Sequence, residues 1–80
     1  MRIVVMPPFD REFFGGEGVL EIEAPTLLAL VDRLGDLAPD FADQAEARAA
    51  FAVDGVFAPD WTRSLAGAED VVLLQRVAGG

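Results

Sequence analysis

Residues 71–80 read Val71-Val72-Leu73-Leu74-Gln75-Arg76-Val77-Ala78-Gly79-Gly80. The run begins with four apolar residues, which is typical of a buried strand, and ends in two glycines. Because glycine has no Cβ, such a tail is thin, flexible and able to thread a narrow channel in another protein. Gly80 also presents an α-carboxylate that no side chain shields. A frayed end or a linker is the alternative, although adjacent terminal glycines are roughly a one-in-a-hundred accident at this composition.

Two strands are expected near the start of the chain. Residues 2–6 are a short apolar run, and Pro7-Pro8 ends it because proline offers no ladder donor. Residues 19–23 alternate between apolar and polar side chains from Leu20 onward, as a half-buried strand does. Residues 9–18 form a long connection in which Gly15-Gly16 supplies the turn. The two strands are therefore expected to pair as a hairpin.

A helix follows the hairpin. Thr26 is a suitable N-cap, since its hydroxyl can accept a hydrogen bond from a first-turn amide. Gly35 is expected at the C′ position, just past the helix end. Between them, four apolar residues have the i, i+3, i+4, i+7 spacing of one helix face: Leu27, Leu30, Val31 and Leu34.

The remaining elements are shorter. Residues 40–48 have the composition of a second, exposed helix, and residues 49–53 predict a third strand. Asp54-Gly55 is a tight turn before a return strand at 56–58. Residues 60–70 are expected to be a loop with one helical turn, anchored by Trp61 and Leu65, and residues 71–74 the last strand. This order predicts an α+β fold: a mixed sheet of four to five strands with one main helix across one face.

Composition limits the chemistry. The 80 residues predict one domain, and there is no Cys, His, Tyr or Lys. Cysteine nucleophiles, the usual zinc sites, histidine bases and lysine Schiff bases are therefore excluded. Asp10, Glu12 and Glu17 are spaced too irregularly for a cation site, so no metal is expected. The terminal carboxylate is the best remaining candidate for a reactive group.

Charge and hydropathy indicate the setting. The net charge is −8, which argues against nucleic acid and anionic membrane as partners. It favours a protein partner with a basic surface, or it simply keeps a small domain soluble. No apolar run is long enough to span a membrane, and the first residues do not read as a signal peptide. The protein is expected to be cytoplasmic.

Taken together, the hairpin, the helix opened by Thr26, the Asp54-Gly55 turn and the final strand running into Val77-Ala78-Gly79-Gly80 resemble the β-grasp, ubiquitin-like fold. More closely, the chain resembles the small sulfur carriers, namely the small subunit of molybdopterin synthase and the thiamine-pathway carrier. The resemblance spans the whole chain, with residues 1–76 as the β-grasp domain and 77–80 as a flexible tail. Residues 65–71 are similar to the family's approach to the last strand, with Ala66 and Ala68 replacing its aspartates. Gln75-Arg76 replace the paired prolines common in molybdopterin synthase small subunits.

The resemblance implies a carrier rather than an enzyme, with no cofactor bound to the chain. A ubiquitin-activating-type enzyme would use ATP and Mg²⁺ to adenylate the Gly80 carboxylate. Persulfide sulfur would displace AMP and leave a terminal thiocarboxylate. That sulfur would pass to a precursor held on a second partner, for which the large subunit of molybdopterin synthase is expected. Val77, Ala78 and Gly79 would form the tail that enters both partners.

The same resemblance suggests where partners bind. Side chains alternate along strands, and the resemblance to ubiquitin puts Val71 and Leu73 in the core. Val4, Val72 and Leu74 would then form an apolar patch on the open face, unless residues 36–48 or a dimer contact cover it.

Two further positions are partner candidates. Arg76 would guide docking onto acidic groups of the activating enzyme, or only solubilise the strand end. Phe13 and Phe14 cannot both face the core on an extended segment, so one of the two is expected to be exposed, and Phe14 is the predicted partner contact.

Three other functions remain open. The chain could be a ubiquitin-like modifier joined through Gly80 to lysines of other proteins, although without Lys it could not build lysine-linked chains of itself. It could carry sulfur for thiamine or another sulfur metabolite. It could also be an interaction module in which the glycines are incidental.

Overall fold

Strand β1 (Arg2–Val5) lies between two partner strands. It pairs antiparallel with β2 (Val19–Glu21) and parallel with β5 (Asp70–Gln75). The structure, a computed structural model, describes residues 1–76. The antiparallel pairing confirms the hairpin that the first two apolar runs predict.

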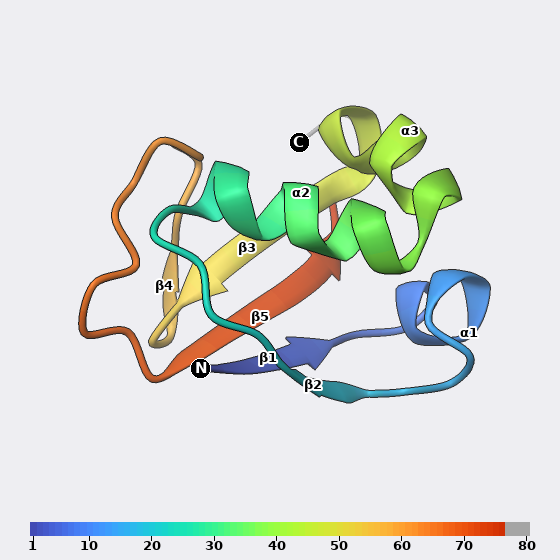
Figure 1. Ribbon diagram of the computed structural model, residues 1–80, viewed down its shortest axis with the longest axis horizontal. Helices are drawn as coiled ribbons and strands as arrows, with labels where there is room; N and C mark the ends of the chain where they lie inside the picture. Colours follow the sequence, from blue (N-terminus) through green and yellow to red (C-terminus); the bar gives the residue numbers. More distant parts are fainter. Residues whose placement is uncertain (77–80) are drawn as a thin grey trace.

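Strand β5 is the centre of the sheet. On its other side it pairs antiparallel with β3 (Ala49–Val53), which in turn pairs antiparallel with β4 (Val56–Phe57), so the order is β2-β1-β5-β3-β4. Asp54 and Gly55 join β3 to β4 with positive φ angles of 48° and 84°, as a two-residue hairpin turn requires. The fold is therefore α+β with a mixed five-stranded sheet (Figure 1).

Helix α2 (Leu27–Leu37) begins where the sequence predicts. The Thr26 hydroxyl accepts a hydrogen bond from the Ala29 amide at 3.1 Å. The carbonyls of Arg63 and Trp61 accept hydrogen bonds from the Leu27 and Leu28 amides, at 3.2 and 2.8 Å. The first-turn amides that a helix leaves unpaired are thus satisfied by the cap and by the loop before β5.

The end of α2 differs from the prediction. Gly35 lies inside the helix, two residues before its end, and not at a C′ position. A Cβ built on Gly35 would lie 2.8 Å from the Cβ of Ala42 in α3 (Pro39–Arg48). The glycine is therefore explained by the close approach of two helices, which no local pattern in the sequence reveals.

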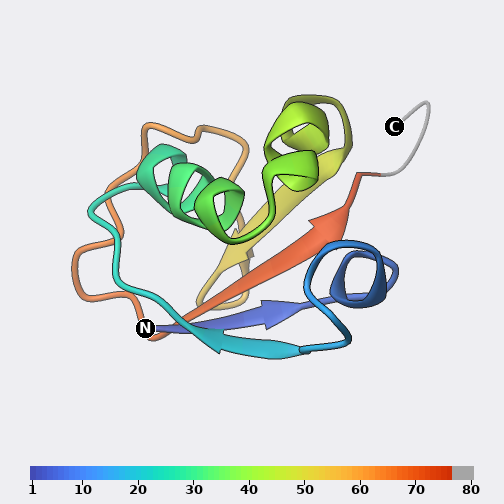
Figure 2. The same ribbon diagram turned by 45° about the vertical axis from the view of Figure 1, so that its right-hand side comes forward.

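Helix α3 confirms the second predicted helix but is not merely exposed. Its Phe41 and Ala45 are buried, and it lies beside α2 on the same side of the sheet (Figure 2). Two helices, and not one main helix, therefore cover that face. Since α3 lies on the helical side, it does not cover the opposite face of the sheet.

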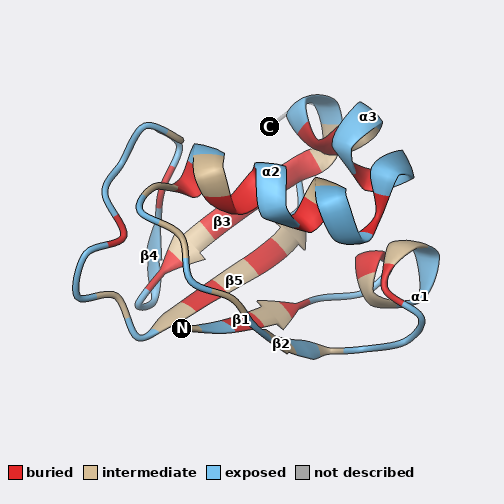
Figure 3. Ribbon diagram, in the orientation of Figure 1, coloured by how far each residue is buried: buried red, intermediate tan, exposed pale blue. Residues whose placement is uncertain are grey.

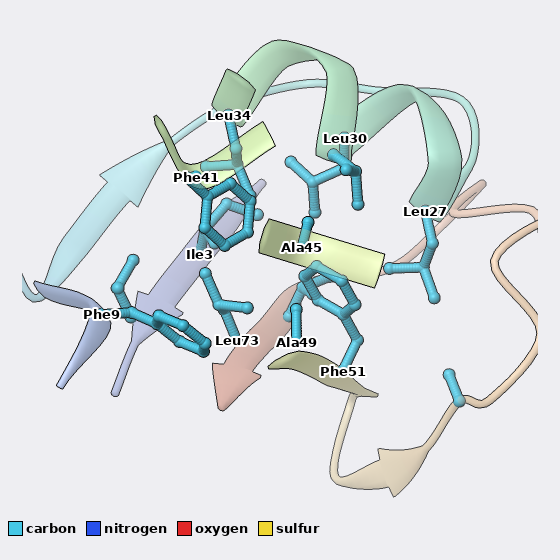
Figure 4. Packing of buried hydrophobic residues seen from close by; sticks show 14 of the residues in the cluster. Ile3, Phe9, Leu27, Leu30, Leu34, Phe41, Ala45, Ala49, Phe51 and Leu73 are labelled. Atoms are coloured by element: carbon cyan, nitrogen blue, oxygen red, sulfur yellow. The ribbon is translucent and has the colours of Figure 1, made fainter. Parts of the chain in front are cut away.

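The core fills the space between the two helices and the sheet. Figure 4 shows side chains of α2 and α3 meeting those of the strands. Along β5, residues facing the helices are buried and the alternate residues are more exposed, whereas in β3 every residue except Ala52 is buried (Figure 3). Burial of these apolar surfaces is the dominant stabilising term. The largest fully buried side chains are Ile3, Phe9, Leu27, Leu30, Leu34, Phe41, Phe51, Val71 and Leu73.

Two connections differ from expectation. The segment expected as a plain connection contains a short helix, α1 (Phe9–Phe13), whose Phe9 packs edge-on against Phe41 with ring centroids 5.7 Å apart. The stretch from Asp60 to Glu69 contains turns but no helical turn. Leu65 is nevertheless buried, and Trp61 packs edge-on against Phe51 at 5.5 Å, so both anchor the loop as predicted.

Candidate functional site

The open face of the sheet carries an apolar row that crosses every strand. Residues paired in register lie on the same face, and the pairs Val19–Val4, Val4–Val72, Val72–Ala52 and Ala52–Phe57 join β2, β1, β5, β3 and β4. Val19 and Phe57 at the two ends are 47% and 64% exposed, and the three between are half-buried. We call these five residues the apolar row.

A charged row lies next to it on the same face. Arg2 pairs in register with Glu21 on β2 and with Asp70 on β5. The Arg2 Nε lies 3.9 Å from Asp70 Oδ1, and both side chains are about half exposed, so this pair contributes little stability. The face is therefore polar where β5 begins and apolar toward the end of β5.

The predicted patch residues are all found on this face. Val4, Val72 and Leu74 are half-buried and point away from the helices, whereas Val71 and Leu73 are fully buried in the core. The assignment of faces is therefore confirmed. Within residues 1–76, neither α2 nor α3 covers the patch, since both pack on the other face.

Arg76, the last described residue, is tied to the body of the protein. Its amide donates a hydrogen bond to the Arg48 carbonyl at 2.7 Å, and its Nη2 donates to the Ala49 carbonyl at 3.2 Å. The chain therefore leaves the sheet from β5 at a fixed place, beside the start of β3. The predicted tail residues, Val77, Ala78, Gly79 and Gly80, lie outside the described residues.

The prediction that Phe14 contacts a partner is wrong, because its side chain is buried. It is only 9% exposed, and its ring and that of Phe13 both lie 5.6 Å from the ring of Phe41. The prediction assumed an extended segment, in which neighbouring side chains point in opposite directions. Here α1 ends at Phe13, and the turn lets both rings reach α3. Phe14 is a core residue and does not present its side chain to a partner.

A groove at the end of the open face was not predicted. It has a volume of about 560 Å³ and lies across β5, β3 and the start of the following loop, with Ala50, Phe57, Trp61, Leu74 and Arg76 among its lining residues. The small residues Ala50 and Ala52 on the open side of β3 are the sequence signal for it. The sequence predicts Trp61 only as a residue that anchors the loop, and it does so by packing against Phe51.

Arg48, the last residue of α3, is the centre of a cluster next to Arg76, where the chain leaves the sheet. Its guanidinium lies 5.1 Å from the ring centroid of Phe9 and 5.7 Å from that of Phe13. Glu12 accepts hydrogen bonds from both Arg48 Nη atoms, at 2.7 and 2.9 Å. This pairing lowers the pKa of Glu12 and raises that of Arg48. The arrangement holds α1 against α3 and offers no base, because the carboxylate is already paired.

Three further findings concern the function of the chain as a whole. In the described part of the chain, no three Asp or Glu side chains come together as metal ligands would. Among residues 1–76, no helix has the length and apolar character needed to cross a bilayer. Neither a protein-family model nor a curated protein sequence matches the chain. The functional argument therefore rests on the chain's own residues and their arrangement.

Proposed function

We propose that this chain is a sulfur carrier with a β-grasp fold, whose Gly80 carboxylate becomes a thiocarboxylate that donates sulfur in cofactor biosynthesis, with molybdopterin as the leading pathway. The observation that supports this proposal is the position of Arg76. This residue follows the central strand β5, directly precedes the tail, and donates a hydrogen bond to the Ala49 carbonyl of β3. The segment that bears the glycines therefore follows directly on the central strand of the sheet. That arrangement supports a tail presented by a folded body.

The topology supports the β-grasp assignment. The antiparallel β1–β2 pair is followed by a helix across the sheet, and β5 lies between β1 and β3, parallel to the first strand. The sequence features that carry the resemblance lie at the matching places, with Thr26 capping α2 and Asp54-Gly55 turning between β3 and β4. In this proposal, residues 1–76 are the recognition domain and residues 77–80 the reactive tail.

The chemistry takes place at the Gly80 carboxylate. Its oxygen attacks the α-phosphorus of ATP, and pyrophosphate leaves with Mg²⁺ on the activating enzyme. The terminal sulfur of a persulfide on a partner then attacks the acyl carbon, and AMP leaves. A thiol reductant cleaves the resulting acyl disulfide, which leaves the thiocarboxylate. With no Cys, His or Lys, the chain supplies the carboxylate and the docking surface and leaves catalysis to its partners.

Partner docking is assigned to the apolar row and to Leu74. Apolar patches beside a reactive group are typical protein interfaces, and this one extends toward the end of β5 from which the tail departs. The two partners in this proposal are a ubiquitin-activating-type adenylyltransferase and the large subunit of molybdopterin synthase. The net charge of −8 would speed encounters with basic surfaces on them. Because adenylation draws on cytoplasmic ATP, the proposed carrier acts in the cytoplasm.

The second candidate is a ubiquitin-like modifier joined through Gly80 to lysines of other proteins. It uses the same tail, fold and activation step, and differs only in the final acceptor. A carrier for thiamine or another sulfur metabolite differs only in the synthase that it meets.

Removing Gly79 and Gly80 tests the tail-based proposals. The circular dichroism spectrum and melting temperature should be unchanged, because residues 1–76 form the described sheet and helices. Complementation of a host strain that lacks the gene should be lost. Full complementation by the shortened chain would contradict both the carrier and the modifier.

A further inference from the structure

The groove at the end of the open face has a simple structural origin. On that face β3 carries Ala50 and Ala52, while the paired residues on either side are larger: Leu74 beside Ala50, and Phe57 beside Ala52. Since an alanine side chain ends at Cβ, β3 forms a floor between two taller walls. The Asp54-Gly55 turn and the following loop bring Pro59 and Trp61 to the β4 side of this floor.

The walls of the groove have a defined chemistry. Phe57, Trp61, Pro59 and Leu74 make them apolar, and among the described residues that line the groove Arg76 is the charged one. Among residues 1–76, the ion pairs do not include Arg76, whose Nη2 donates to the Ala49 carbonyl. A guanidinium has five N–H donors, so several remain to bind a carboxylate at the groove rim.

We propose that this groove binds an extended segment of a partner protein, which places one large apolar side chain over Ala50 and an adjacent carboxylate against Arg76. Trp and Arg are the residue types that most often dominate protein interfaces, and here they stand on the rims of one concave surface. Charge complementarity determines the occupant, since the carboxylate of the partner segment meets the guanidinium of Arg76. A second copy of this chain would instead bring a net charge of −8 against −8.

This binding site goes beyond the proposed function, because it assigns an extended segment of stated chemistry to the groove; it shares Phe57 and Leu74 with the surface assigned to partner docking and does not use the chemistry of Gly80. It would contribute affinity for any partner that carries such a segment. The two proposals are tested independently. A negative result in the tail experiment does not contradict the groove proposal, and a negative result in the groove experiment does not contradict the tail proposal.

The test uses the full 80-residue chain labelled with ¹⁵N and three tetrapeptides. Acetyl-Ser-Phe-Asp-Ser-amide carries both recognition groups, acetyl-Ser-Phe-Asn-Ser-amide lacks the charge, and acetyl-Ser-Ala-Asp-Ser-amide lacks the apolar side chain. The first peptide should shift the amide signals of Ala50, Leu74 and Arg76 and the indole N–H of Trp61. The second and third should bind more weakly, each by about threefold to tenfold.

A matched pair of variants locates the site. Ala50→Leu fills the floor of the groove and should weaken binding of the first peptide by about tenfold. Ala66→Leu makes the same change at an exposed position of the loop before β5, outside the lining residues, and should leave binding within about twofold of the parent chain. Arg76→Gln should remove the preference for Asp over Asn. A dispersed spectrum for each variant shows that the fold is retained.

Four results would overturn the inference. The first is equal binding by the parent chain and Ala50→Leu, and the second is equal binding of the Asp and Asn peptides to the parent chain. The third is a set of nuclear Overhauser contacts from Trp61 to the methyl groups of Val77 and Ala78, since the chain's own tail would then be the occupant. The fourth is a shift of the groove signals with protein concentration alone, which would indicate a second copy.

Discussion

Both Nη atoms of Arg48 donate hydrogen bonds to the carboxylate of Glu12, Nη1 to Oε2 at 2.7 Å and Nη2 to Oε1 at 2.9 Å. The pair joins α3 to α1 across 36 positions of sequence. Gln44 accepts a third hydrogen bond from Nη1, and the rings of Phe9 and Phe13 pack near the guanidinium. Since the Arg48 carbonyl also accepts the Arg76 amide, one residue links α1 to the end of β5.

Glu12→Gln should reduce the free energy of unfolding at neutral pH, and it should make this free energy depend less on pH in the acid range. Because Arg48 lowers the pKa of Glu12, the unfolded chain binds a proton at higher pH than the folded protein does. The stabilisation is therefore present above the ordinary glutamate pKa of about 4.3. It is lost as the pH falls through the lowered pKa of the folded state. Urea unfolding at pH 7 and at pH 3 should show the two proteins converging in acid.

Glu46→Gln is the matched control for that experiment, because Glu46 is an exposed residue of α3. Its stability should follow that of the parent chain at both pH values. A difference between the parent chain and Glu12→Gln that persists undiminished at pH 3 would contradict the account.

Gly35→Ala should destabilise the protein, although alanine is the better helix former by about 1 kcal/mol. Its Cβ would meet the Cβ of Ala42 at 2.8 Å, and overpacking of this kind costs about 1–3 kcal/mol. The double variant Gly35→Ala with Ala42→Gly should recover most of the loss, because it moves the missing methyl group to the other helix. Melting temperatures of the single and double variants measure this coupling.

Gly18→Ala serves as the control, since a Cβ at Gly18 would meet nothing within 4 Å. It should be neutral or slightly stabilising. An increase in stability for Gly35→Ala would show that the two helices separate easily.

Gly35 also illustrates which features of the fold the sequence could not predict. The periodic leucines and Thr26 correctly located α2, because helix faces and caps are local properties. The sequence predicts Gly35 just past the helix end, since a glycine after a periodic run usually ends a helix. Its actual role depends on Ala42, which approaches it only after both helices pack on the sheet.

The candidate site was predictable to a similar degree. Strand alternation separates Val72 and Leu74 from Val71 and Leu73, because it depends only on the period of two, and the resemblance to ubiquitin indicated which pair faces the core. Together they correctly assigned Val4, Val72 and Leu74 to the open face. The burial of Phe14 depends on the conformation of a short segment that has no periodicity of its own. The groove depends on Ala50, Phe57 and Trp61, which come from a strand, its neighbour and a loop, so the small residues of β3 are a signal for it but do not define it alone.

Leu73→Ala and Leu74→Ala should differ strongly, although the residues are adjacent and identical. Leu73 is fully buried in the core, while Leu74 is half-buried on the open face. Truncating a buried leucine costs about 2–5 kcal/mol, and truncating Leu74 should cost about 1 kcal/mol or less because part of it stays in water. Chemical denaturation of both variants measures the difference. Equal losses would contradict the assignment of faces.

Asp54 should tolerate Asn better than Gly, and Gly better than Ala. Its Oδ1 accepts hydrogen bonds from the amides of Glu69 and Asp70 at 3.0 and 2.9 Å, and its φ is 48°. Asn keeps an acceptor and suits this backbone, Gly suits the backbone alone, and Ala loses both, at an added strain of about 1–2 kcal/mol. Thermal melts rank the three variants, and an Ala variant as stable as Asn would contradict this reading.

The measurement that tests the central proposal most directly is the intact mass of the protein from its native host, with the C-terminal peptide sequenced. The account predicts a species heavier by one oxygen-to-sulfur replacement, located at Gly80. Gly80 joined to lysines of other proteins, with no sulfur-bearing form, would contradict the carrier and favour the modifier.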